Sequence, residues 1–223
     1  AKITKKLPYF AFLCFTTPAH CGNIDSIDGY PILGYRYGDK FRGRRASMMQ
    51  HILFKDTPHK YIRPFSTQLL KWVGNKQRFA HEIVGSFPEK FGRYYEPFLG
   101  SGGVLATLAP LNALASDTFA PLMEMWLTLK ANPEKLKEWY RERWQIAHGE
   151  RKKEGYEKIK TSYNRAPNGA DLLFLCRSCY GGVVRFRQID GYMSTPCGVH
   201  EPITPASFDK RVDLWHEKIQ FAD

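Results

Sequence analysis

The sequence predicts an α/β protein with a doubly wound, Rossmann-like core and an inserted region of helices and a β-hairpin. Two observations carry this prediction. The order strand, glycine-rich turn, helix, strand and acidic residue between Tyr94 and Asp117 is typical of a nucleotide-binding α/β unit. A long charged helical stretch then leads to residues 183–195, whose Asp190-Gly191 pair favours a tight hairpin turn.

Composition sets the broad class. The chain has 223 residues, enough for a sizeable core, and its 43% hydrophobic content excludes a disordered protein. The net charge of +11 favours a polyanionic partner: DNA, RNA or an anionic membrane face. No stretch approaches the roughly 20 apolar residues that span a bilayer, so we expect no membrane partner. The five cysteines are odd in number and irregularly spaced, which favours a reducing cytosol over a disulfide framework.

Residues 1–47 differ from the rest of the chain. They lack a helical period, are broken by glycines, and carry a basic run at residues 40–45. Met48 and Met49 stand where the composition changes. We therefore predict an atypical extension over 1–47 that is not native, with the natural start near Met48. The alternative is a basic arm that lies on DNA.

Regular elements begin after Pro64. The predicted core elements are an amphipathic helix over 76–87, a strand over 94–98, a helix over 104–109, a strand over 113–116 and a helix over 121–130. The insertion is predicted to contain a long helical stretch over 134–163, a break at 167–169, a short apolar helix over 171–179 and a hairpin over 183–195. Cys176 and Cys179 lack a second pair at zinc-binding spacing, so we assign them to the end of the apolar helix and predict no metal site.

The glycine-rich turn indicates a ligand. Gly100 and Gly102 follow a strand, where glycines let the backbone approach a bound group. Asp117 lies seventeen residues beyond Gly100, close to the spacing at which an acidic residue binds ribose hydroxyls. The pair indicates an adenosine-type ligand; the alternative for Asp117 is an N-cap on the following helix.

The segment Lys71-Trp72-Val73-Gly74-Asn75-Lys76, followed by Glu96-Pro97-Phe98 and Asp117, resembles the Dam-type adenine-specific DNA methyltransferases. The resemblance implies a doubly wound Rossmann-like methyltransferase core that binds S-adenosyl-L-methionine. It implies that Trp72 forms a wall of the site, Lys76 a polar contact and Asp117 the ribose contact. The full predicted cofactor set is Trp72, Lys76, Glu96, Pro97, Phe98, Gly100, Gly102 and Asp117.

The resemblance continues into the insertion. Residues 175–186 are similar to the family's segment leading into a DNA-contacting hairpin, and Thr195-Pro196-Cys197-Gly198 to the Val-Pro-Phe-Gly that closes it. A two-stranded ribbon fits the major groove, and a flipped adenine needs a stacking partner. The predicted DNA-binding residues are Arg177, Tyr180, Arg185 and Arg187. The alternatives are that Tyr180 lies in the core and that the arginines only face water.

The family's Asp-Pro-Pro-Tyr motif, which holds the adenine amine, does not occur in these residues. We expect it beyond Asp223, so no catalytic residue is assigned and the chain alone should be inactive. The predicted divisions are the extension over 1–47, the cofactor-binding part over 64–130, the target-recognition insertion over 131–205 and a truncated return to the core over 206–223. The sequence departs from the family pattern at three places: Asn75 stands in place of Gly, Thr118-Phe119 in place of Ile-Asn, and Gly181 in place of Asn.

The resemblance implies an enzyme that transfers a methyl group to the exocyclic amine of adenine in double-stranded DNA, as part of a restriction–modification or DNA-marking system. A cognate restriction endonuclease, a monomeric state and a prokaryotic or phage-type cytosol are expected. The alternatives are a non-catalytic fragment that binds DNA and cofactor, an S-adenosyl-L-methionine-dependent methyltransferase acting on RNA or protein, and a dinucleotide-binding oxidoreductase.

Overall fold

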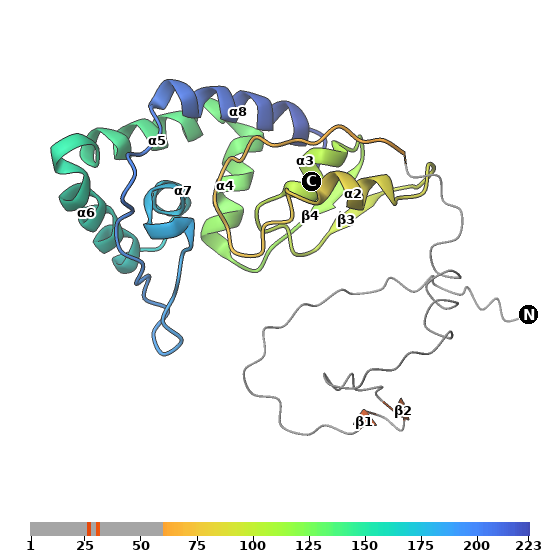
Figure 1. The fold of residues 1–223 in the computed structure, drawn as a ribbon, viewed down its shortest axis with the longest axis horizontal. Helices are drawn as coiled ribbons and strands as arrows, with labels where there is room; N and C mark the ends of the chain where they lie inside the picture. The colour runs from red at the N-terminus through yellow and green to blue at the C-terminus, as the bar shows by residue number, and fades with distance from the viewer. Residues whose placement is uncertain (1–25, 28–29, 32–59) are drawn as a thin grey trace, which may run out of the picture. The chain divides into compact units, whose positions relative to one another are not determined.

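The computed structural model describes residues 26–27, 30–31 and 60–223 (Figure 1). Before residue 60 it gives two strands of two residues each, β1 (Ser26–Ile27) and β2 (Tyr30–Pro31), paired antiparallel. Apart from these strands, residues 1–47 lie outside the described residues. Both interpretations of that segment, a non-native extension or a basic arm on DNA, therefore stay predictions.

From residue 60 onward the fold is mixed α/β, which confirms the predicted class. The elements are α2 (Ala80–Gly85), β3 (Tyr94–Glu96), α3 (Gly103–Leu108), β4 (Ala113–Ala115), α4 (Ala120–Ala131), α5 (Pro133–Ile146), the 3₁₀ turn η1 (Gly149–Arg151), α6 (Lys152–Arg165), α7 (Gly169–Ser178), the 3₁₀ turn η2 (Tyr180–Gly182) and α8 (Pro205–Ile219). No helix among the described residues is long and apolar enough to cross a membrane.

The sheet is small and parallel. β3 pairs with β4 in the register Tyr94↔Ala113 and Glu96↔Ala115. On the other edge of β4, Ala222 forms a parallel bridge with Ala113, and the Asp223 backbone exchanges two hydrogen bonds with β4. β4 thus lies between β3 and residues 222–223. A parallel pair joined through α3 is the unit that the sequence predicts, whereas the doubly wound arrangement of the whole core stays a prediction.

Caps and prolines explain where the helices begin. Asn132, Asn168 and Thr204 each occupy an N-cap, and each side-chain oxygen accepts a backbone N–H from three residues further on. Pro133 and Pro205 follow two of these caps, where a proline costs no hydrogen bond. The predicted break at 167–169 is thereby confirmed, because Asn168 starts α7.

The predicted stretch over 134–163 is two helices, not one. Gly149 has a φ of +59° in the turn between α5 and α6. Gly155 in α6 lies against the backbone of Ile146 and Ala147, so close that a β-carbon there would collide with the Ile146 carbonyl oxygen. Charged, helix-favouring residues continue through this turn, so the sequence pattern alone does not reveal it.

The helix predicted over 76–87 begins later, at Ala80. Asn75 accepts the backbone N–H of Gln77 at 2.8 Å, and the Gln77 side chain donates to the carbonyls of Phe65 and Thr67. These contacts hold residues 75–79 in turns. Phe79, within the range predicted as an amphipathic helix, is consequently 49% exposed.

α7 lies at the centre of the helical part. It packs against α4, α5 and α6, and every residue from 169 to 178 except Arg177 is buried (Figure 1). Cys176 is fully buried in α7 and Cys179 follows it at 4% exposure, as the apolar-helix interpretation predicts. A single hydrophobic cluster runs from Leu69 through α7 to Ala222. The insertion therefore shares its core with the sheet, and the domain boundaries stay predictions.

The predicted hairpin is present as two antiparallel arms with few ladder contacts. Phe186 pairs with Met193, and the backbone N–H of Arg187 donates to the Tyr192 carbonyl at 2.9 Å. The turn, however, spans residues 188–191 and is not the two-residue Asp190-Gly191 turn. Gly191 is its last residue, with a φ of +67°, and its N–H donates to the Arg187 carbonyl.

Candidate cofactor cleft and DNA-contacting hairpin

A cleft of about 310 Å³ lies between the segment before α2 and the glycine turn after β3. Its walls are residues 72–76, residues 96–104 and the end of β4. The lining residues are Trp72, Val73, Gly74, Lys76, Glu96, Phe98, Leu99, Gly100, Ser101, Gly103, Val104 and Asp117. The structure thus brings together six of the eight predicted cofactor residues: Trp72, Lys76, Glu96, Phe98, Gly100 and Asp117.

Asp117 fixes the floor of this cleft. One carboxylate oxygen accepts the N–H of Gly100 at 2.9 Å, and the other accepts the N–H of Phe119 at 3.1 Å. The N-cap of α4 is Phe119, so Asp117 closes a short turn before the helix and does not cap it. Each carboxylate oxygen can accept more than one hydrogen bond, so Asp117 retains acceptor capacity for ligand hydroxyls.

Trp72 forms a wall opposite the glycine turn. A β-carbon at Gly100 would lie 3.4 Å from the Trp72 ring, and Gly100 has a φ of +50°. The absent side chain therefore leaves the space beside the indole open. Asn75 accepts an N–H in the turn that leads to Lys76, so this departure from the family pattern supports the local backbone.

Glu96 carries an unusual carboxyl group in the cleft. Burial raises its pKa to about 7, opposed by the hydrogen bond that the Tyr94 hydroxyl donates at 3.1 Å. Burial and the neighbouring Glu96 raise the pKa of Tyr94 well above its ordinary range, so the phenol stays a donor. Glu96 can consequently accept or donate a hydrogen bond near neutral pH.

Two predicted cofactor residues do not line the cleft. Pro97 is exposed beside it. Gly102 has a φ of +65°, and a β-carbon there would lie 3.1 Å from Trp126 and 3.2 Å from Trp215. Gly102 is needed for the backbone conformation and for packing between two indoles, and its contact with the cofactor stays a prediction.

The sequence prediction also missed half of the lining. The missed residues are Val73, Gly74, Leu99, Ser101, Gly103 and Val104. All six lie within or next to the two motifs. Their position next to the predicted residues could have identified them, because consecutive loop residues that form a cleft wall contribute backbone atoms to the lining as well as side chains.

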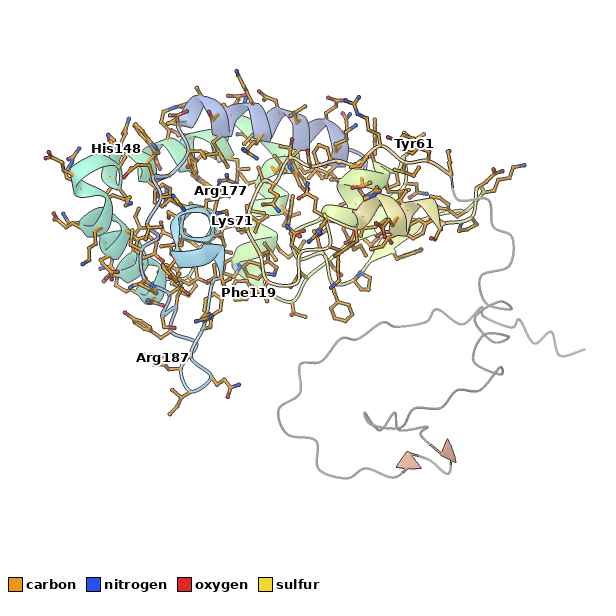
Figure 2. All side chains as sticks on the ribbon, in the orientation of Figure 1. Tyr61, Lys71, Phe119, His148, Arg177 and Arg187 are labelled. Atoms are coloured by element: carbon orange, nitrogen blue, oxygen red, sulfur yellow. The ribbon has the colours of Figure 1, made fainter. Side chains whose placement is uncertain are left out.

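The hairpin presents two of the four predicted DNA residues to solvent. Arg185 and Arg187 are exposed, and Arg187 lies at the far end of the hairpin in Figure 2. Tyr180 is 59% exposed, so it is not a core residue. It borders a second cleft of about 730 Å³ whose wall includes Lys71 and Arg211. This side of the protein therefore combines an exposed aromatic ring with several cations.

Arg177 differs from the other predicted DNA residues. One guanidinium nitrogen donates to the carbonyls of Gln68 and Leu69, at 3.1 and 2.7 Å. Burial lowers the pKa of this group, and the guanidinium lies over the Phe208 ring. The structure thus uses Arg177 to hold the segment that leads to Trp72. Its predicted contact with DNA stays a prediction.

A row of aromatic rings joins the cleft to the hairpin. Trp72 lies 5.5 Å from Phe119, and Phe119 lies 5.3 Å from Phe186, measured between ring centroids. Phe119 stands between the two regions in Figure 2. Phe119 replaces the Asn common in the family, and here it connects the wall of the candidate cofactor cleft to the hairpin.

The parallel strands, the glycine turn and the carboxylate at the end of β4 define an α/β protein with a nucleotide-type cleft. Comparison with protein families narrows this class. The model of the D12 class N6 adenine-specific DNA methyltransferases matches residues 72–220, so the chain belongs to this family. The resemblance recognised in the sequence is therefore confirmed.

Three curated relatives support this assignment. The chain is 36% identical over 75 residues to the type II methyltransferase M1.LlaDCHI of Lactococcus lactis subsp. cremoris, covering 34% of this chain and 25% of the relative. It is 27% identical over 169 residues to the type II methyltransferase M.MjaIII of Methanocaldococcus jannaschii, covering 67% and 56%. It is 27% identical over 141 residues to the DNA N-6-adenine-methyltransferase of Escherichia phage P1, covering 60% and 18%. These matches span a fifth to about half of the relatives' lengths.

Proposed function

We propose that this chain supplies the cofactor-binding and DNA-recognition parts of an adenine-specific DNA methyltransferase with a doubly wound core. The enzyme transfers a methyl group from S-adenosyl-L-methionine to the exocyclic amine of adenine in duplex DNA, within a restriction–modification or DNA-marking system. The observation that carries this proposal is the joining of a nucleotide-type cleft to an arginine-bearing hairpin through Phe119 and Phe186.

The donor groups of the cleft fit S-adenosyl-L-methionine. Trp72 offers an apolar face for a flat base, and the open space at Gly100 admits a group close to the backbone. Asp117 can accept from ribose hydroxyls, and Lys76 can meet a carboxylate. Glu96 lies in the same cleft with a carboxyl group suited to an ammonium or hydroxyl donor.

When bound, S-adenosyl-L-methionine supplies an electrophilic methyl group on a sulfonium. The residues of this chain bind and orient it: Asp117 fixes the ribose end, Lys76 the amino-acid end, and Trp72 excludes water from one side. Holding the donor in one orientation lowers the entropic cost of the reaction, which is the main contribution that a binding cleft can make.

The DNA side rests on charge and shape. The net charge of +11 favours association with a phosphate backbone. A narrow two-armed hairpin with exposed Arg185 and Arg187 suits the major groove, and exposed Tyr180 can stack where a base leaves the helix. Residues 131–205 would then form the target-recognition insertion. The cytosolic location, the monomeric state and a cognate endonuclease complete the proposal.

Two binding experiments test it. Calorimetry should show that the chain binds S-adenosyl-L-methionine and that Trp72→Leu weakens this binding, whereas the surface variant Arg141→Gln does not. Anisotropy with labelled duplexes should show stronger binding to DNA than to RNA of the same sequence. A preference for RNA would replace the proposed substrate, and failure to bind the cofactor would refute the proposed cleft. In the full-length protein, labelled methyl groups should appear on N6 of adenine.

A further inference from the structure

The tip of the hairpin holds one arginine in a fixed orientation. Arg187 donates from Nε to Asp190 Oδ1 at 3.1 Å and from a terminal nitrogen to Oδ2 at 2.5 Å. The Tyr192 ring lies under the guanidinium, 4.2 Å from ring centroid to Cζ. Asp190 Oδ1 also accepts the N–H of Tyr192, and this backbone hydrogen bond is the largest cause of its lowered pKa. The carboxylate is therefore anchored to the turn as well as to the arginine.

This geometry leaves one edge of the guanidinium available. Asp190 occupies the edge formed by Nε and Nη2, and Tyr192 covers one face. The edge between Nη1 and Nη2 keeps its outward N–H groups. Two parallel donors on a planar, rigid fork match the O6 and N7 acceptors of guanine in the major groove.

The ion pair is not explained by stability. The Arg187 and Asp190 side chains are 51% and 46% exposed, and exposed pairs of this kind contribute little to folding. The four-residue turn places Asp190 against both partners, with Gly191 in the left-handed conformation. The local structure is thus arranged to orient Arg187 at the hairpin's end (Figure 2).

We propose that Arg187 reads a guanine in the recognition site, and that Asp190 is the residue that positions it. The inference rests on the proposed function and specifies one base of its substrate. Guanine is favoured over phosphate because Asp190 balances the charge of Arg187, and a neutral pair gains little from a phosphate. Arg185 forms no ion pair within the described residues, so it is the phosphate-contacting arginine of the two.

Selection of bound duplexes from a randomised DNA library tests the inference. Two single variants, at Arg187 and Asp190, are compared with the wild type first, and a double variant and a control at Arg185 follow. The wild-type chain should enrich a motif that contains guanine. Arg187→Lys keeps the charge but lacks the planar fork, so preference for guanine should fall about tenfold at one position only. Asp190→Asn keeps an oxygen for the Tyr192 N–H but removes the carboxylate, so preference should fall at that same position. Unchanged motifs in both variants would overturn the inference.

Salt dependence provides the second readout. The double variant Arg187→Gln/Asp190→Asn removes a neutral pair, so its slope of log affinity against log salt should equal that of the wild type while the guanine preference is lost. The matched control Arg185→Gln should lower the slope by about 0.9 and leave the motif unchanged. The reverse pattern would make Arg187 a phosphate contact and overturn the inference. Absence of any duplex binding would overturn the proposed function instead.

Discussion

Replacing Gly102 with alanine should destabilise the fold strongly, because this position combines a strained backbone with a filled space. Its φ is +65°, and the new methyl group would lie 3.1 Å from Trp126 and 3.2 Å from Trp215. Neither indole is free to move. Trp126 donates to the Gly100 carbonyl at 3.0 Å, Trp215 donates to the Thr67 carbonyl at 2.8 Å, and both rings are buried.

The magnitude follows from two terms. The left-handed conformation costs a residue with a β-carbon about 1–2 kcal/mol. Forcing a methyl group between two fixed rings adds typically 1–3 kcal/mol. Gly102→Ala should therefore lower the free energy of unfolding by roughly 2–5 kcal/mol, a large fraction of the stability of an ordinary domain.

Urea unfolding followed by circular dichroism measures this loss, and Gly181→Ala provides the control. Gly181 has a φ of +64° but has nothing within 4 Å of the position of its β-carbon, so only the backbone term applies. We expect Gly181→Ala to cost about 1–2 kcal/mol. Equal urea midpoints of unfolding for the two variants would show that the indoles can move aside, and the packing role assigned to Gly102 would then be wrong.

Three further predictions concern charged groups. The raised pKa of Glu96 means that the folded state binds this proton more tightly than the unfolded chain does, so the free energy of unfolding should fall as pH rises from 4.5 through 7. Urea titrations across this range should show a smaller fall for Glu96→Gln. Asp117→Asn loses its charge and one of the two side-chain oxygens that accept backbone N–H groups, so calorimetry should show cofactor affinity reduced about tenfold or more. Unchanged affinity would mean that Asp117 only stabilises the local backbone. Arg143→Met leaves buried Asp171 without its ion-pair partner and should lower the free energy of unfolding by about 3 kcal/mol. The control Arg141→Met, at an exposed ion pair, should lower it by less than about 1 kcal/mol. Equal losses in urea unfolding would contradict this prediction.

Much of the candidate cofactor cleft was predictable because most of its lining residues lie in two short segments of the sequence. Glycines after a strand and an acidic residue after the next strand occupy fixed places in a parallel α/β unit, since both strands end at the same edge. The spacing between Gly100 and Asp117 predicted that the two residues serve one ligand site, and the structure places an Asp117 carboxylate oxygen 2.9 Å from the Gly100 nitrogen. Here the local chain geometry is sufficient to bring the residues together.

Arg177 shows why other roles could not be predicted. Its sequence neighbours place it near the hairpin, where an arginine suggests DNA. Its actual partners are the carbonyls of Gln68 and Leu69, more than 100 residues earlier in the chain. Residues 60–70 form no helix or strand, so the carbonyls of Gln68 and Leu69 have no partner in regular secondary structure. Only the tertiary packing of α7 against that segment determines which arginine supplies them.

The hairpin tip illustrates a second limit of sequence patterns. An Asp-Gly pair predicts a two-residue turn from backbone preferences alone. In this chain the Asp190 side chain has two partners, the Tyr192 N–H and Arg187, and both are satisfied when the turn is two residues longer. Gly191 still supplies the left-handed residue that the sequence predicts, but as the fourth residue of the turn and not as the second. The Asp190 side chain therefore determines the turn geometry, and the contacts that shape this tip are the same ones that hold Arg187 for the proposed reading of a guanine.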